Sequence, residues 1–123
     1  MATILVVDDD SVSREILEAL LEDADHCVLL ASSGDEAIEI FKKNIVDAVI
    51  TDIFMPGKTG LDTIRELREI NPQVKVATVS GGSTFTAHEM LQWAENGVGA
   101  HTLQKPLKKT DVLKTVNELL AGR

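Results

Sequence analysis

The chain has 123 residues, enough for one domain with a single core, and 44% of them are hydrophobic, which argues against disorder. Its formal net charge is −8, with 20 acidic and 12 basic residues, a balance that argues against direct binding to nucleic acid. No apolar run reaches the roughly 20 residues that a membrane-spanning helix needs, and no signal-peptide pattern opens the chain, so we expect a cytoplasmic protein without membrane contact.

The first strand and helix are predicted by their hydrophobic patterns. Thr3 to Val7 is a continuous apolar run, typical of a strand buried on both faces. Asp8-Asp9-Asp10 follows, and then a helical pattern whose apolar face is expected to contain Val12, Ile16, Leu17, Leu20 and Leu21. Cys27 to Ala31 is a second apolar strand, and we expect Cys27, the single cysteine, to lie in the core rather than to react.

The middle of the chain repeats this alternation. Ser33 and Glu36 form a capping box that predicts the start of a second helix. The run Ala48 to Thr51 reads as a third buried strand, and it ends on the carboxylate of Asp52. A third helix is expected from about Gly60 until Asn71-Pro72, because proline disfavours helical structure in the residue before it.

The last third of the chain contains two further strand and helix pairs. Val74 to Val79 predicts a fourth strand, and a capping box of Thr86 and Glu89 predicts the helix after it. Ala100 to Leu103 is a weak fifth strand, and a fifth helix follows Lys105-Pro106. Five uninterrupted alternations predict one α/β domain over residues 1–123, with a doubly wound parallel sheet covered by five helices.

Chemically capable side chains follow four of these strands. Asp8 and Asp9 follow the first strand, Asp52 ends the third, Ser80 follows the fourth, and Lys105 follows the fifth. Ligands of open parallel sheets bind outside the carboxyl ends of the strands, so we expect these five side chains to form one site.

The composition of this set predicts phosphoryl chemistry with a divalent cation. Two unit charges about 4 Å apart repel by roughly 4 kcal/mol at an effective dielectric of 20, so clustered carboxylates call for a cation, and Mg²⁺ suits oxygen ligands. Lys105 can then stabilise a phosphoryl oxygen, and an ionised Asp52 can attack phosphorus. Two plainer interpretations are that Asp8-Asp9-Asp10 only favours a helix N-terminus, and that Ser80 is only a turn residue.

Taken together and in this order, the motifs resemble the receiver domains of two-component response regulators. The resemblance rests on Ile4 to Asp10, Asp52-x-x-Met55-Pro56 with Gly60 beyond, Ser80-Gly81 and Lys105-Pro106. It implies a flavodoxin-like sheet of five parallel strands in the order 2-1-3-4-5. It also implies that Asp52 is the phosphoacceptor, that Ser80 and Lys105 sense and stabilise the phosphoryl group, and that Mg²⁺ is held by Asp8 (through water), Asp9, Asp52 and the carbonyl of Phe54.

Two positions depart from the family pattern. Thr102 stands where the family usually has a tyrosine or phenylalanine that turns inward on phosphorylation, so we expect the loop at Gly81-Gly82 and the helix after it to transmit the signal instead. Phe54 is bulky where many members are polar, and its side chain is expected to shield the acyl phosphate from water.

The resemblance also implies partners. The phosphoryl group would come from a histidine kinase, a phosphotransfer protein or a small donor such as acetyl phosphate, and a downstream protein would read the result. Kinase contacts are expected at Val12, Ser13, Ile16 and Leu107. We expect a single-domain, CheY-like signalling module rather than an enzyme. The alternatives are a phosphorelay intermediate, a fragment of a larger regulator or hybrid kinase, and a Mg²⁺-dependent phosphatase or flavin binder of the same fold.

Overall fold

The structure, a computed structural model, describes residues 2–53, 55–80 and 101–122. Its strands are β1 (Thr3–Val7), β2 (Cys27–Ala31), β3 (Ala48–Asp52), β4 (Val76–Ser80) and β5 (His101–Gln104). The helices in these residues are α1 (Ser11–Asp23), α2 (Gly34–Lys43), α3 (Gly60–Ile70) and α5 (Lys109–Leu120). The helix predicted from Thr86 lies outside the described residues, so four of the five predicted helices are observed.

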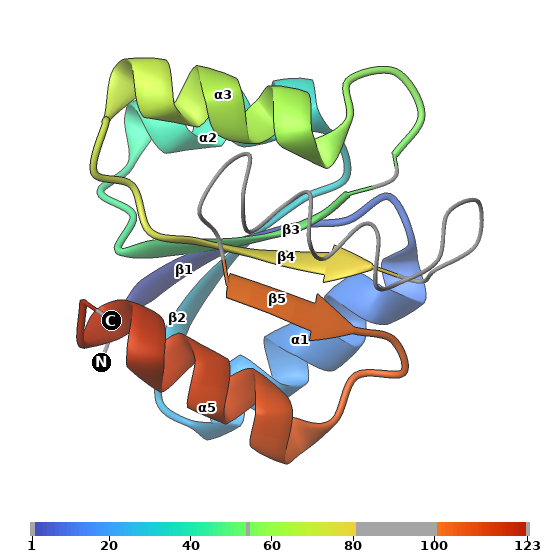
Figure 1. Cartoon of the computed structure of the whole chain (residues 1–123). Helices are drawn as coiled ribbons and strands as arrows, with labels where there is room; N and C mark the ends of the chain where they lie inside the picture. The colour runs from blue at the N-terminus through green and yellow to red at the C-terminus, as the bar shows by residue number, and fades with distance from the viewer. Residues whose placement is uncertain (1, 54, 81–100, 123) are drawn as a thin grey trace.

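The strands form one sheet in the order β2-β1-β3-β4-β5, and all four neighbouring pairs are parallel. Helices α2 and α3 cover one face of this sheet, and α1 and α5 cover the other (Figure 1). The predicted flavodoxin-like, doubly wound sheet is therefore confirmed. Because β1 and β3 are neighbours although β2 lies between them in sequence, the chain reverses direction across the sheet at this point, where such folds bind ligands.

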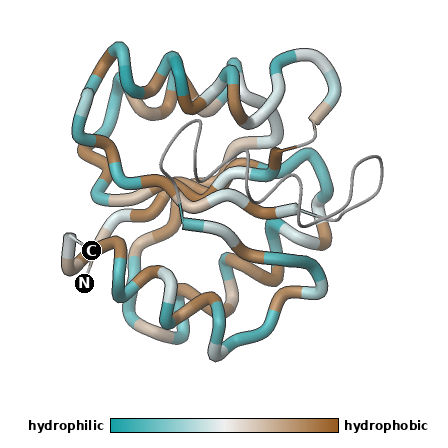
Figure 2. The backbone as a smooth tube through the Cα atoms, in the orientation of Figure 1, coloured by the Kyte–Doolittle hydropathy of each residue, from teal (hydrophilic) through white to brown (hydrophobic). Residues whose placement is uncertain are grey.

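Each face of the sheet has its own hydrophobic core, and side chains of β1 alternate between the two. Ile4 and Val6 pack with α1 and α5, whereas Leu5 and Val7 pack with α2 and α3. In Figure 2 the hydrophobic residues are concentrated along the strands at the centre of the molecule. Full burial of one aliphatic side chain stabilises a fold by about 1.5–3 kcal/mol, so the apolar runs hold the strands, and the ends of the strands are free to carry polar side chains.

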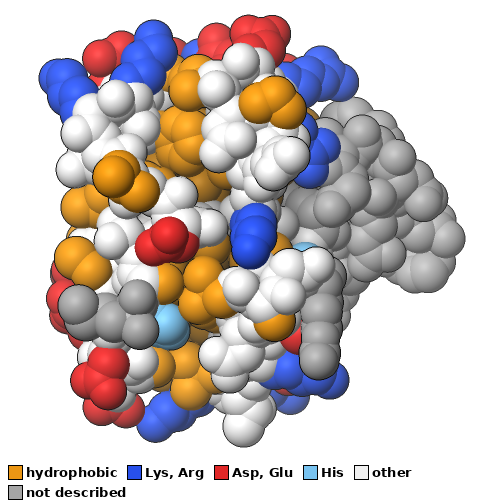
Figure 3. Space-filling view, turned by 90° about the vertical axis from the view of Figure 1, so that its left-hand side faces the viewer, with side chains coloured by type: hydrophobic (Ala, Val, Ile, Leu, Met, Phe, Trp, Pro, Cys, Tyr) orange, Lys and Arg blue, Asp and Glu red, His pale blue; other side chains and the backbone are white. Residues whose placement is uncertain are grey.

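Of the predicted site residues that the structure describes, none lies at the end of the molecule where the strands begin. Figure 3 shows this end, with hydrophobic side chains gathered along its middle between charged ones, and both chain termini lie here (Figure 1). Ile45, in the connection before β3, is 89% exposed. In the part of the chain that the structure describes, no helix is long and apolar enough to cross a membrane.

Two predictions of burial were wrong. Cys27 is exposed, because it begins β2, which is the edge strand of the sheet. In α1, Val12 and Ile16 are 59% and 43% exposed. The buried face of this helix instead contains Ser13, Leu17 and Leu21. Ser13 is tolerated there because its hydroxyl donates a hydrogen bond to Asp10.

Two local details also differ from the prediction. The Ser33 hydroxyl accepts the backbone N–H of Glu36 as predicted, but the Glu36 carboxylate accepts the N–H of Ser32, so the capping box is only half formed. Strand β4 begins at Val76 rather than Val74, because the N–H of Val74 donates to the carbonyl of Asn71 in a turn. The capping box at Thr86 lies outside the described residues.

Gly60 allows α3 to begin directly against the end of β3. Its N–H donates to the carbonyl of Ile53 at 2.9 Å, and a Cβ at this position would lie only 2.0 Å from the carbonyl oxygen of Asp52. Gly60→Ala is therefore expected to lower the free energy of unfolding by about 3 kcal/mol, measured by urea denaturation, because the backbone at the end of β3 must shift.

Gly57→Ala is the matched control for this prediction. Gly57 has a φ of +77°, but a Cβ there would meet no atom within 4 Å. Its substitution carries only a backbone penalty of about 1 kcal/mol. If the two variants lose the same stability, close approach to Asp52 is not the reason for glycine at position 60.

Candidate functional site

The predicted site residues meet at the carboxyl ends of four adjacent strands. Val7 of β1 pairs with Thr51 of β3, so the next residues, Asp8 and Asp52, leave the sheet side by side. On the other side of β3, Asp52 pairs with Val79 of β4. At the last residue of β4, the backbone carbonyl of Ser80 accepts a hydrogen bond from the backbone N–H of Lys105 at 3.0 Å.

Three carboxylates form a cluster at this edge. One oxygen from each of Asp8, Asp9 and Asp52 lies within 4.8 Å of the others. Asp8 is 1% exposed and Asp52 is 6% exposed, whereas Asp9 faces solvent. Burying two carboxylates this close together is unfavourable unless cations compensate their charge. The cluster is therefore explained by cation binding and not by a contribution to the stability of the fold.

The third acid of the run, Asp10, has a different role. Its carboxylate accepts the N–H of Val12 at 3.1 Å and the hydroxyl of Ser13 at 3.0 Å, so it caps the N-terminus of α1. The hydrogen bond from Ser13, followed by that from Val12, lowers the pKa of Asp10. The plainer interpretation of Asp8-Asp9-Asp10 as helix-start acids therefore holds for Asp10 and does not account for the other two.

Lys105 is the cation of the cluster. Its Nζ lies 3.3 Å from Oδ2 of Asp8 and 3.5 Å from Oδ2 of Asp52, and 27% of its side chain is exposed. Burial acts most strongly on this group and lowers its pKa, but attraction to Asp52 and then Asp8 outweighs burial, so the pKa of Lys105 is raised. The ammonium is therefore charged at neutral pH, and it is positioned to contact an anion bound beside Asp52.

The carboxylates fit a divalent cation. Oδ2 of Asp8 is buried, and among the described residues its polar neighbour is the ammonium of Lys105, with which it forms an ion pair at 3.3 Å. One ammonium also leaves two of the three carboxylate charges uncompensated. A hard divalent ion such as Mg²⁺ prefers such oxygen ligands, and Asp8, Asp9 and Asp52 are the described residues that could hold it. Phe54, whose carbonyl was the fourth predicted ligand, lies outside the described residues.

Ser80 and Thr102 lie where the sequence placed them. Ser80 is 1% exposed at the end of β4, next to the strand that ends at Asp52. Thr102 is half-buried within β5 and pairs with Thr78 of β4. The Gly81-Gly82 loop and the following helix, which were expected to transmit the signal, lie outside the described residues.

Arg14 is a residue of this site that the sequence reasoning missed. Its Nη1 donates to the backbone carbonyl of Asp8 at 2.7 Å, so a guanidinium on α1 braces the loop that carries two of the three carboxylates. A signal for it was available. Cations are unfavourable near a helix N-terminus, and Arg14 stands only four residues after the cap at Asp10.

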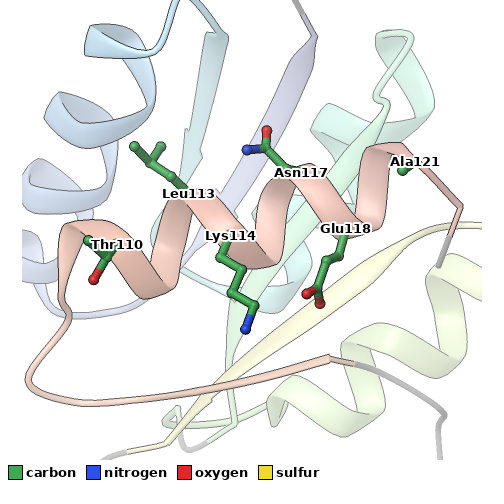
Figure 4. A pocket seen from close by; sticks show the side chains of 6 residues that line it. All are labelled: Thr110, Leu113, Lys114, Asn117, Glu118 and Ala121. Atoms are coloured by element: carbon green, nitrogen blue, oxygen red, sulfur yellow. The ribbon is translucent and has the colours of Figure 1, made fainter.

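A groove on another part of the described surface is separate from this chemistry. It is an open groove of about 670 Å³ along α5. Figure 4 shows its lining residues, which are Thr110, Leu113, Lys114, Asn117, Glu118 and Ala121. None of them belongs to the carboxylate cluster, so the reactive groups and this groove are separate features of the surface.

Comparison with known proteins agrees with this arrangement. Residues 4–117 match the model of the response regulator receiver domain family. Protein PilH of Pseudomonas aeruginosa is 32% identical over 122 residues, which cover 99% of this chain and 100% of that protein. A crystal structure of a response regulator receiver domain protein from Clostridium thermocellum is 34% identical, with a TM-score of 0.89 over 99% of this chain and 96% of that one.

Longer proteins are similar as well. The autoinducer 1 sensor kinase/phosphatase LuxN of Vibrio campbellii is 33% identical over 104 residues, which are 85% of this chain. The chain spans only 12% of the length of that relative. Similarity therefore extends both to a protein of the same length and to a small part of a much larger one.

Proposed function

The chain belongs to the response regulator receiver domain family, a signalling module of two-component systems, and on this premise we propose that it accepts a phosphoryl group on Asp52. The observation that carries the proposal is the position of Lys105, whose Nζ lies 3.3 and 3.5 Å from the two buried carboxylates. A structural ion pair needs one acid for one base. Two buried acids around a single ammonium, with a third acid nearby, favour a site for a phosphoryl group and a cation.

In the proposed reaction, a carboxylate oxygen of Asp52 attacks phosphorus of a phosphohistidine on the donor protein. The new P–O bond forms as the P–N bond breaks, and the electron pair of the P–N bond remains on the imidazole nitrogen. Lys105 stabilises negative charge on the transferring phosphoryl oxygens, and the hydroxyl of Ser80 donates a hydrogen bond to one of them. With acetyl phosphate as the donor, the bond that breaks is P–O and acetate leaves.

Mg²⁺ is the proposed cofactor, held by Asp8, Asp9 and Asp52, with the carbonyl of Phe54 as a further ligand. When bound, it supplies positive charge that offsets the charge of the phosphoryl oxygens and orients them. The residues of the chain hold the carboxylates in place before binding: Asp10 caps α1, and Arg14 fixes the carbonyl of Asp8. Preorganised ligands of this kind reduce the cost of ordering the site.

Asp8→Asn is expected to remove most of the stabilisation that Mg²⁺ gives the protein. At a Mg²⁺ concentration about 100 times its Kd, the free energy of unfolding of the wild type should rise by about 2.7 kcal/mol, because the ion binds only the folded cluster. Urea denaturation with and without Mg²⁺ measures this increment. Asp25→Asn, which changes an exposed aspartate with a φ of 67°, should keep the full increment. An equal increment in both variants contradicts the assignment of Asp8.

The proposed donor is a histidine kinase or a phosphotransfer protein, and the proposed reader is a downstream protein. Val12 and Ile16 support a docking role for α1, because they are exposed beside the β1–α1 loop that carries two of the carboxylates. Leu107, the other apolar candidate, is half-buried. Ser13 is buried and bonded to Asp10, so it is not proposed as a contact.

Incubation with acetyl phosphate and Mg²⁺ tests this function. The mass of the intact protein should increase by one phosphoryl group per chain and no further, because the proposed site has a single acceptor, Asp52. A phosphatase of the same fold would instead release inorganic phosphate from a free phosphate ester over many turnovers. Repeated turnover of p-nitrophenyl phosphate without labelling of the chain would overturn the proposal in favour of that enzyme.

A further inference from the structure

A second charged cluster lies outside the carboxylate site, at the loop that follows Asp52. Nζ of Lys58 lies 3.0 Å from Oδ1 of Asp35, at the start of α2, and it also donates a hydrogen bond to the carboxylate of Glu66 on α3. We call these three residues the Lys58 cluster. It joins the β3–α3 loop to the two helices that cover one face of the sheet.

The loop that carries Lys58 is held at its other points by the core and the backbone. Ile53 and Met55 are 1% and 7% exposed and belong to the hydrophobic core beneath α2 and α3. The N–H of Gly60 donates to the carbonyl of Ile53, which closes the loop at its base. Lys58 lies within this closed loop, two positions before Gly60, and its contacts with Asp35 and Glu66 tie this side of the loop to α2 and α3.

The methylene stem of Lys58 is also packed, against the start of α2. A Cβ at Gly34, the first residue of α2, would lie 2.9 Å from Cδ and 3.0 Å from Cγ of Lys58. Only 21% of the Lys58 side chain is exposed. The lysine therefore lies across the start of α2, in a gap that glycine leaves open, rather than extending into solvent as most surface lysines do.

An ordinary surface ion pair is the plainer interpretation, and such pairs contribute little to stability. Three features set the Lys58 cluster apart from it. One ammonium is shared by two carboxylates, its stem is covered, and it connects the β3–α3 loop both to α3 and to the start of α2, which lies 23 positions earlier in the sequence. Hydrogen bonds to Glu66 and then Asp35 also raise the pKa of Lys58, so the ammonium remains charged.

We propose that Lys58 is a positioning residue that fixes the β3–α3 loop so that the carboxylate of Asp52 is held facing Asp8 and Asp9. The described ion pairs of Lys58 are with Asp35 and Glu66 and not with the carboxylate cluster of Asp8, Asp9 and Asp52. It therefore acts through the loop between Ile53 and Gly60. The inference rests on the proposed function, because it concerns the same cation and phosphoryl site.

The test compares Lys58→Met with the wild type in two measurements. The Kd for Mg²⁺, from a titration of the metal alone, should increase by about 10-fold in the variant, since residues that orient metal ligands have effects of this size. Amide exchange at Ile53 and Gly60 in the Mg²⁺-free protein should become faster. Lys58→Arg, which keeps the charge, should restore most of the affinity, and Lys43→Met, which removes an exposed lysine of α2, should change neither measurement.

The outcomes separate the two proposals. If Lys58→Met lowers the free energy of unfolding but leaves the Mg²⁺ Kd and the amide exchange of the loop unchanged, Lys58 has only a structural role and the inference is overturned. If the wild type binds Mg²⁺ and Lys58→Met binds it equally well, the inference alone fails. If the wild type itself binds no Mg²⁺ and gains no phosphoryl group, the proposed function fails, and the inference fails with it.

Discussion

Asp52→Asn is expected to abolish the phosphoryl gain from acetyl phosphate, to below the detection limit of intact-mass measurement. The amide has the shape of the carboxylate but no ionised oxygen with which to attack phosphorus. Asp52 is 6% exposed at the end of β3, and Asn fills the same space, so the fold is expected to persist. Retained secondary structure by circular dichroism confirms that the loss is chemical rather than structural.

Asp10→Asn is the matched control. It removes a carboxylate from the same edge of the sheet, but asparagine caps helices as well as aspartate does, so α1 should be preserved. The control should gain one phosphoryl group at a rate close to that of the wild type. A full phosphoryl gain in Asp52→Asn would show that another residue is the acceptor.

Lys105→Met is expected to slow phosphorylation by about 10²–10³-fold, the effect of losing one preorganised charge that stabilises a transition state. The variant should also lose about 2 kcal/mol of stability without Mg²⁺, because the buried carboxylates of Asp8 and Asp52 then lack a cation. Saturating Mg²⁺ should reduce that loss of stability, since a bound ion compensates the same two charges. Urea denaturation and the time course of the mass gain measure the two effects.

Lys108→Met is the matched control for Lys105→Met, because it removes one positive charge outside the carboxylate cluster. Lys108 is exposed at the N-cap of α5 and makes no side-chain capping hydrogen bond there, so its loss should leave both the phosphorylation rate and the stability near wild type. The assignment of Lys105 is wrong if the two lysine variants are phosphorylated at the same rate.

Much of the site could be predicted because its residues stand at the ends of strands that the sequence pattern identifies. Apolar runs of five residues identify buried strands, and a parallel sheet brings their carboxyl ends to one edge, so Asp8, Asp52 and Lys105 had to meet once the strand order was known. The order itself came from a resemblance and is confirmed by the pairing of β1 with both β2 and β3. Strand periodicity alone does not determine which strand lies at an edge.

The errors and omissions concern how the elements pack against one another, which the local sequence pattern does not determine. Cys27 was expected in the core because its run is apolar. It is exposed because it is the first residue of an edge strand, where few neighbours cover the side chain. Val12 was expected to be buried because helical spacing alone does not determine how a helix is rotated against the sheet. The Lys58 cluster was missed because its acids stand 23 positions before the lysine and eight after it, and nothing local brings them together.

Locating the phosphoryl group on the phosphorylated protein tests directly whether Asp52 carries it. The phosphorylated protein can be reduced with borohydride, which converts an acyl phosphate to a stable alcohol, and its peptides can then be mapped by mass spectrometry. The modification is expected at Asp52 alone, in the presence of Mg²⁺. Modification at a histidine, a serine or another carboxylate, or an unmodified Asp52 in a protein that has gained a phosphoryl group, would contradict it.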